Sequence, residues 1–111
     1  MSISFQDLVP RIEIADGLRA RMKGLLGRDG LGRGRALWIE SCGIVHTFFM
    51  RFPLDLVFVD RECRVTRIVF GVPPGRVAWG GLRARRVLEM EAGWFPRDAL
   101  RPGDVVNGPQ A

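Results

Sequence analysis

One apolar run, residues 40–60, constrains this chain more than any other part of its sequence. The run reads ESCGIVHTFFMRFPLDLVFVD and holds the only histidine, one of the two cysteines and four of the seven phenylalanines. Strands favour β-branched and aromatic side chains, because these fit a pleated, half-buried surface. The run therefore predicts extended structure at the centre of the fold, and its few polar side chains need an explanation.

Asp55 is the polar side chain that burial affects most. Counting in steps of two along the segment that follows Pro53 places Asp55 on the same face as Val57 and Val59. Burying an unpaired carboxylate is costly. We therefore expect Asp55 to find a positive partner or several hydrogen-bond donors, or to take up a proton.

Length and composition predict a single domain spanning residues 1–111. A chain of 111 residues can bury a core without disulfides or a structural metal, but is too short for two domains. It has no run of about 18 apolar residues, and its start lacks a basic leader followed by an apolar core, so we expect a cytoplasmic protein that does not span a membrane. Cys42 and Cys63 lack the spacing of a CxxC or a Cys/His pair, so reduced thiols are expected.

Periodicity predicts several short strands and one early helix. The helix is expected over residues 18–28, where leucines and a methionine recur at spacings of three and four. Residues 71–81 are expected to form a loop, and residues 92–100 a loop or one helical turn. Strands are expected at residues 11–14 with Ile12 and Ile14 inward, and at 36–39, 45–50, 53–60, 63–70, 86–91 and 105–106. This order predicts an α+β domain, compact and β-rich, with a curled antiparallel sheet or a small barrel and one N-terminal helix.

The net charge of +5 and the pI near 10.9 would suit nucleic-acid binding if the basic residues were clustered. They are scattered instead, and the densest group, Arg83, Arg85 and Arg86, is only a short basic patch. Nucleic acid is therefore the less favoured partner. A small anionic ligand or a protein partner is expected, and the oligomeric state stays open.

A metal or nucleophile site built on Cys42, His46 and Met50 is not favoured. Zinc needs three or four converging ligands, and this spacing of four and four converges on a helix, whereas the segment is predicted to be extended. A Cys/His pair lacks a third group to orient the histidine. We assign no catalytic residue, no metal site and no cofactor from the sequence.

Two carboxylates, Asp55 and Glu89, each lie between apolar residues on predicted strands. If they met in one pocket, repulsion would favour protonation of one of them and permit the acid–base chemistry of a hydrolase. If Arg21 or Arg28, seven residues apart on the predicted helix, reached them, the group would be an ion-pair network that fixes the helix to the sheet. We favour the network.

The segments LRARMKGLLGR, HTFFMRFPLDLVFVD, RVLEMEAG and LRPGDVV, in this order, resemble family 192 of the domains of unknown function, a group of small prokaryotic domains. The resemblance covers about residues 12–106. It implies a compact, β-rich domain with a barrel-like sheet and no established activity. Many members carry Trp-Met followed by Lys-Asn-Thr, where this chain has Phe49, Met50, Arg51 and Phe52. The pattern falls on Arg21, Gly24, Leu25, Gly27, Arg28, Met50, Pro53, Leu54, Asp55, Leu88, Glu89, Gly93, Gly103 and Asp104.

The function expected from the sequence is binding. The ligand would be a small anionic molecule or an acidic peptide segment, because the surface is basic. Trp79, placed between glycines, is either a lid on the core or an exposed contact at the rim of the site. The alternatives are a hydrolase that uses Asp55 and Glu89, and nucleic-acid binding. The candidate ligand-binding residues are Arg21, Arg28, His46, Met50, Asp55, Glu89 and Trp79.

Overall fold

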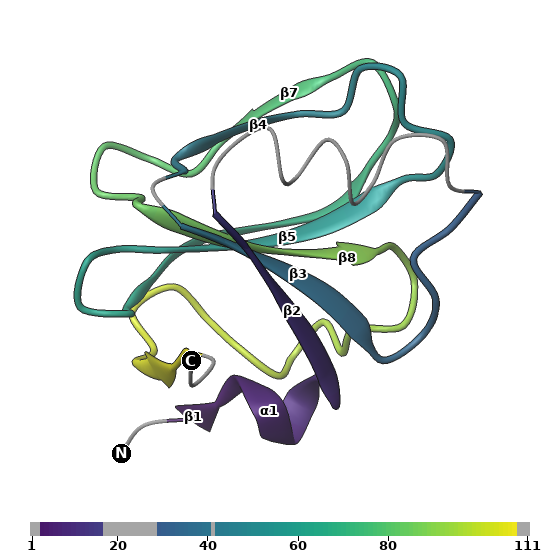
Figure 1. The fold of residues 1–111 in the computed structure, drawn as a ribbon. Helices are drawn as coiled ribbons and strands as arrows, with labels where there is room; N and C mark the ends of the chain where they lie inside the picture. Colours follow the sequence, from purple (N-terminus) through teal and green to yellow (C-terminus); the bar gives the residue numbers. More distant parts are fainter. Residues whose placement is uncertain (1–2, 17–28, 41, 109–111) are drawn as a thin grey trace.

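The computed structural model describes residues 3–16, 29–40 and 42–108. This part of the chain is rich in strands and has one short helix (Figure 1). The predicted helix over residues 18–28, including Arg21 and Arg28, lies outside the described residues. The elements in chain order are β1 (Ile3–Ser4), α1 (Phe5–Leu8), β2 (Arg11–Asp16), β3 (Arg35–Glu40), β4 (Ile44–His46), β5 (Leu54–Val59), β6 (Val65–Val72), β7 (Val77–Trp79), β8 (Arg86–Glu91) and β9 (Val106–Asn107).

The main sheet has five strands in the order β2-β3-β8-β5-β6. β2 runs parallel to β3, and the other neighbours are antiparallel, so the sheet is mixed. β4 and β7 form a separate antiparallel ribbon, and β1 pairs with β9 in parallel. In the described part of the chain these sheets do not close into a barrel. The predicted β-rich fold is confirmed, whereas the curled antiparallel sheet or barrel is not.

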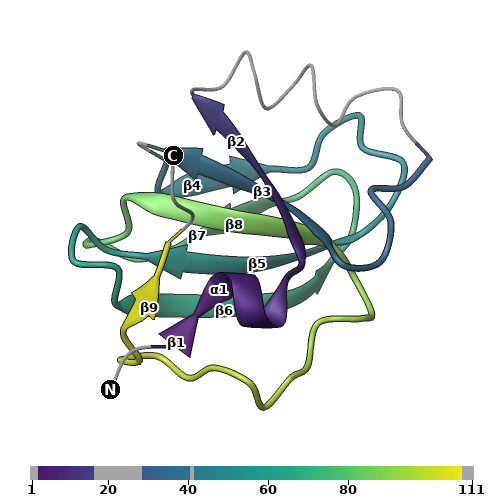
Figure 2. The same cartoon turned by 60° about the horizontal axis from the view of Figure 1, so that its bottom comes forward.

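The core has two halves, one on each face of the main sheet. All six residues of β5 are buried. Leu54, Leu56 and Phe58 pack in the half covered by the β4–β7 ribbon, and Val57 and Val59 pack in the half covered by α1 and the C-terminal segment. Figures 1 and 2 show the ribbon on one side of the sheet and α1, β1 and β9 on the other. The predicted alternation along β5 is confirmed, and both of its faces are covered.

The N-terminal segment differs from the prediction in two ways. Residues 5–8 form α1, a short helix that is not among the predicted elements. Ile14 is 48% exposed instead of inward, because β2 is the edge strand of the main sheet and its neighbour Ala15 is the buried residue. The strand itself is present and two residues longer than expected.

The segments on either side of β5 also differ from the prediction. The extended run expected over residues 45–50 ends at His46, and Phe49 then adopts a positive φ of 66° that turns the chain. Residues 71–81 are not all loop, since they contain the end of β6 and the whole of β7. Gly75 and Gly81, with φ of 83° and 105°, make the turns that bracket β7. Strand β8 has the predicted bounds.

Asp55 is a structural residue at an irregular point of β5. Its side chain is 3% exposed. The pairing of β5 with β6 shifts register between Leu54 and Leu56, and at this point Asp55 Oδ1 accepts a hydrogen bond from the Gly71 N–H at 2.8 Å. Oδ2 accepts one from the Gly93 N–H at 3.3 Å. Among the described residues its partners are therefore backbone amides of two neighbouring segments, which satisfy the expectation of several donors.

Replacing Asp55 with alanine is expected to lower the free energy of unfolding by about 2 to 3 kcal/mol, because two hydrogen bonds to a charged group are lost and two donors lose their acceptor. Urea unfolding followed by circular dichroism measures the change. Asp98→Ala, at an exposed position, is the control and is expected to stay within about 0.5 kcal/mol of the wild type. Equal stability of the two variants would contradict the structural role of Asp55.

Candidate functional site

An open pocket of about 780 Å³ lies beside β4, between the ribbon and the segment that leads into β8. One wall is apolar and is formed by exposed side chains. The other wall is polar and basic. The apolar residues are Ile44, Trp79 and Leu82, and the arginines are Arg61, Arg85 and Arg86.

The alternation of the β4–β7 ribbon creates the apolar wall. Val45 and Ala78 face each other across the ribbon and point into the core. The pairs on either side of them, Ile44 with Trp79 and His46 with Val77, therefore point outward. Ile44, Val77 and Trp79 are 60%, 61% and 48% exposed, so this outer face is an apolar surface open to solvent.

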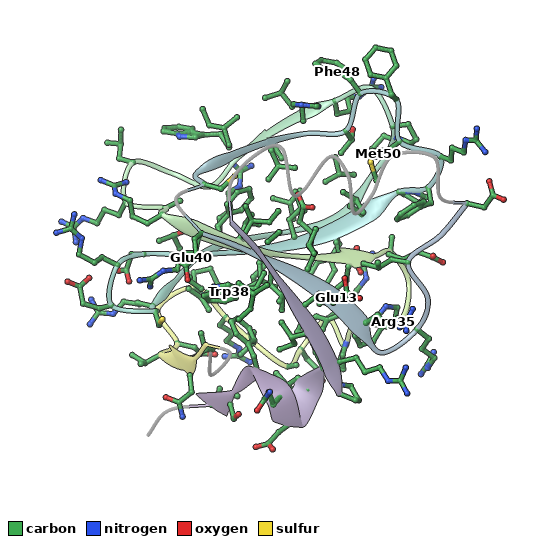
Figure 3. The ribbon with its side chains drawn as sticks, in the orientation of Figure 1. Glu13, Arg35, Trp38, Glu40, Phe48 and Met50 are labelled. Atoms are coloured by element: carbon green, nitrogen blue, oxygen red, sulfur yellow. The ribbon has the colours of Figure 1, made fainter. Side chains whose placement is uncertain are left out.

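His46 stands at the end of this outer face. Its ring stacks on Phe48 with a centroid distance of 5.3 Å and an interplanar angle of 21°. Figure 3 shows Phe48 on the outer side of the ribbon and Met50 on its inner side. Met50 is only 7% exposed and belongs to the core. The turn at residues 47–49 thus separates the two predicted site residues, His46 at the pocket and Met50 in the core.

The basic wall contains an ion pair between Arg86 and Glu40. Arg86 Nε donates to Glu40 Oε2 at 2.7 Å, and Trp38 Nε1 donates to Glu40 Oε1 at 2.9 Å (Figure 3 shows Trp38 and Glu40 side by side). Burial acts to raise the pKa of Glu40, but the hydrogen bonds from Trp38 and Arg86 and the charge of Arg86 outweigh it, so the pKa is lowered from its ordinary 4.5. Arg86 Nη1 also donates to the Arg61 carbonyl at 3.2 Å. Arg86 is therefore held in place.

Arg61 and Arg85 differ from Arg86 because they are exposed and, within the described residues, form no ion pair. Arg85 Nη1 donates to the carbonyls of Leu82 and Ala84, at 3.1 and 2.9 Å. Both arginines also line a neighbouring hollow of about 610 Å³, together with two further arginines and two carboxylates. Those other lining residues are Arg64, Arg83, Asp60 and Glu62. The rim of the pocket thus carries guanidinium groups that are available to an anion.

The structure does not bring the two predicted carboxylates together. Glu89 is fully buried and pairs across the sheet with Leu56 and Leu37, so its side chain lies on the face covered by the ribbon. Asp55 lies on the opposite face with Val57. The expected pocket shared by His46, Asp55 and Glu89 is therefore absent from the described structure, and the paired-carboxylate hypothesis loses its geometric basis. Any contact of these groups with Arg21 or Arg28 lies outside the described residues.

Thr47 is a residue whose role the sequence analysis did not identify. It is fully buried, and its hydroxyl donates to the Pro73 carbonyl at 2.6 Å and accepts from the Arg76 N–H at 2.9 Å. Its backbone N–H donates to the Arg76 carbonyl at 2.8 Å. Thr47 therefore ties the end of β4 to the turn before β7. The apolar positions flanking it gave no sign of this, because its partners are about 26 to 29 residues away.

Among the described residues, no three His, Cys, Asp or Glu side chains are grouped in a way that could hold a metal ion. Cys42 lines the pocket, and its Sγ donates to the Ile44 carbonyl at 3.1 Å. No helix of the described segments has the length and apolarity needed to cross a membrane.

The model of the DUF192 family, described as an uncharacterised ACR, matches residues 2–108. The chain belongs to this family. The resemblance noted in the sequence is thus confirmed, and it extends beyond residues 12–106 at both ends. A search of curated proteins finds no match to this DUF192 domain.

Two solved structures are similar to this DUF192 domain. A protein of unknown function from Novosphingobium aromaticivorans DSM 12444 is 25% identical, with a TM-score of 0.72 over 85% of this chain and 71% of that chain. A proposed transcription regulator from Sinorhizobium meliloti 1021 is 21% identical, with a TM-score of 0.70 over 85% of this chain and 78% of that chain. Both comparisons support the fold.

The lowered pKa of Glu40 predicts a stability difference that depends on pH. Its contribution is present above the ordinary pKa of 4.5 and is lost as the pH falls through the lower folded value. Because the pair is partly exposed, Glu40→Gln is expected to lower the free energy of unfolding by at most about 1 kcal/mol at neutral pH. In urea titrations the difference from the wild type should shrink as the pH falls below the ordinary pKa of 4.5 and vanish once Glu40 is protonated in the folded protein. Glu62→Gln, at an exposed position, is the control. If Glu40→Gln changed the free energy of unfolding equally at neutral and at acidic pH, the lowered pKa of Glu40 would be contradicted.

Thr47→Val is expected to lower the free energy of unfolding by about 1 to 3 kcal/mol, since a hydroxyl that both donates and accepts is removed from a buried turn. Thr66→Val is the matched control. Its Oγ1 is buried and has no hydrogen-bond partner among the residues that the structure describes, so this substitution is expected to be neutral or stabilising. Thermal and urea unfolding measure both changes. If Thr66→Val lowered the free energy of unfolding as much as Thr47→Val, the hydrogen bonds of the hydroxyl would not be the contribution of Thr47 to stability.

Proposed function

We propose that this DUF192 domain binds a small organic anion in the pocket beside β4. The observation that carries the proposal is the combination of two exposed guanidinium groups, Arg61 and Arg85, which form no ion pair with any described residue, and an exposed apolar wall at Ile44 and Trp79. The cavity of about 780 Å³ has the size of small-molecule sites, which combine apolar surface with a few polar groups.

The basic wall and the apolar wall of the pocket would each recognise a different part of the ligand. A guanidinium matches the geometry of a carboxylate or phosphate and donates two parallel hydrogen bonds. Arg86 already uses Nε on Glu40, which leaves Arg61 and Arg85 as the groups for the anion. Trp79 offers its face to the apolar part of the ligand, and His46 lines the same pocket. The ligand class is therefore a carboxylate or phosphate that carries an aromatic or branched apolar group.

The proposal contains no reaction and no cofactor. The oxygens of Asp55 accept structural hydrogen bonds on the far face of the sheet, where they are separated from Glu89 and from the pocket. Neither carboxylate is among the residues that line the pocket. A binding role therefore fits these residues better than acid–base catalysis.

Single-stranded nucleic acid is the second candidate, because four arginines line the hollow beside the pocket, and two of them, Arg61 and Arg85, also line the pocket together with the exposed Trp79. Such proteins combine a basic groove with aromatic side chains on which bases stack. Asp60 and Glu62 line the same hollow, however, and their negative charge opposes a phosphate backbone. The small anion remains the preferred ligand.

A thermal-shift panel of aromatic and branched carboxylates, sugar phosphates, nucleotides and single-stranded DNA tests this proposal, because a ligand that binds only the folded state raises the melting temperature. We expect an apolar carboxylate or phosphate to stabilise the protein. Its affinity, measured by calorimetry, should fall at least about tenfold in the double variant Arg61→Gln with Arg85→Gln, equivalent to about 1.4 kcal/mol.

The control is Arg97→Gln with Arg101→Gln, which removes two exposed arginines outside the pocket and should leave the affinity unchanged. Stabilisation by single-stranded DNA alone would favour the second candidate. A panel without any stabilising anion, or a ligand bound equally by both double variants, would contradict the proposed site.

A further inference from the structure

A second groove, of about 420 Å³, runs between β6 and β7. Both walls are edges: β6 is the last strand of the main sheet, and β7 is one strand of the two-stranded ribbon. The described residues that line it are mostly apolar, with Arg67 and Arg76 as the charged members and no carboxylate. The groove is therefore apolar and positively charged.

The edge of β7 that faces this groove carries backbone groups that β4 does not use. Gly80 and Arg76, which flank β7, are hydrogen-bonded across the ribbon at 2.9 and 2.8 Å. In an antiparallel pair, residues bonded to the partner strand alternate with residues whose N–H and C=O groups point away from it. Val77 and Trp79 occupy these alternate positions, so both direct their N–H and C=O groups to the outer edge.

A contact across the groove confirms this direction. Arg67, on β6, donates from Nη1 to the Trp79 carbonyl at 3.1 Å. A side chain thus occupies the acceptor that the N–H of an adjacent strand would otherwise bind. If a strand took that place, the guanidinium would be released next to it and could pair with an acidic side chain of the incoming segment.

We infer that the β7 edge binds an extended, acidic segment of another protein as an added strand. Main-chain hydrogen bonds to Val77 and Trp79 would provide affinity, as in other complexes where a peptide joins a sheet edge. Alternate side chains would enter the apolar groove, and carboxylates would meet Arg67 and Arg76. β7 has three residues, so the paired part of the segment is short. The inference does not depend on the proposed pocket, because these two arginines do not line that pocket.

The charge of the groove argues for an acidic partner over a second copy of this chain. Pairing two β7 edges would bring Arg67 and Arg76 of one copy next to the same arginines of the other, and each chain carries a net charge of +5. Like charges placed together at an interface oppose association. An acidic segment gains from the same arrangement.

Selection of random ten-residue peptides displayed on phage, against the full chain at low ionic strength, tests the inference. We expect enriched sequences in which Asp or Glu alternates with β-branched or aromatic residues. Synthetic versions should lose at least about tenfold in affinity, or about 1.4 kcal/mol, with the Val77→Pro variant. Proline removes the outward N–H, and an edge position of this kind tolerates proline because no bond to β4 is lost. Hydrogen exchange should slow at the Val77 and Trp79 amides when peptide binds.

Val77→Thr is the matched control, because it keeps the N–H and should bind like the wild type; thermal melts establish that both variants fold. A variant with Arg67→Gln and Arg76→Gln should lose the preference for acidic peptides, whereas Arg61→Gln with Arg85→Gln should keep it. The inference is overturned if no peptide is enriched, if enriched peptides show no acidic bias, or if they bind Val77→Pro as well as Val77→Thr. Self-association that Val77→Pro abolishes would instead assign the edge to a second copy.

Discussion

The burial of β5 on both faces is the constraint on which the rest of this structure depends. A strand whose six residues are all covered needs a layer of structure on each side of its sheet. The β4–β7 ribbon provides one layer, and α1 with the C-terminal segment provides the other. A fully buried Leu or Phe contributes about 1.5 to 3 kcal/mol, so neither layer is dispensable. In a chain of 111 residues each layer is thin, and the ribbon is a single pair of strands. Its inner side chains complete the core, and its outer side chains necessarily form surface.

This arrangement also decides the roles of the buried acidic groups. Successive residues of a strand face opposite halves of the core, so carboxylates on adjacent strands share a pocket only if they have the same parity in the register. Asp55 and Glu89 have opposite parity, because Glu89 pairs with Leu56. Asp55 instead accepts a hydrogen bond from the backbone N–H of Gly71, where the pairing of β5 with β6 is irregular. Chemistry that needs converging side chains has to lie where segments meet at the surface, and the pocket beside β4 is such a place.

Much of the strand pattern could be predicted from the sequence, because alternation is a local signal. β8 has its predicted bounds, and β5 has its predicted two faces. β7 was missed, since its three residues lie between turns rich in glycine and proline whose composition dominates the segment. Of the residues expected at the site, His46 and Trp79 line the pocket beside β4, whereas Met50 is turned into the core by the positive φ at Phe49. Arg61 joins Trp79 in the lining of the pocket only through pairings between strands, and a single sequence contains no record of such register.

The arginines show why the charge of a sequence predicts its surface poorly. Arg86 is fixed by Glu40, Arg67 holds the edge of β7, and Arg61 and Arg85 stand exposed at a pocket. These arginines have different roles, and the role of each depends on which acceptors lie within hydrogen-bond distance of its guanidinium group. Trp79 is shared by the two basic surfaces, since it lines both the pocket and the groove. A ligand in the pocket would contact its side chain, and a strand at the β7 edge would bind its backbone. Occupation of either surface therefore changes the surroundings of the same residue, which makes Trp79 the point where the two surfaces can influence each other.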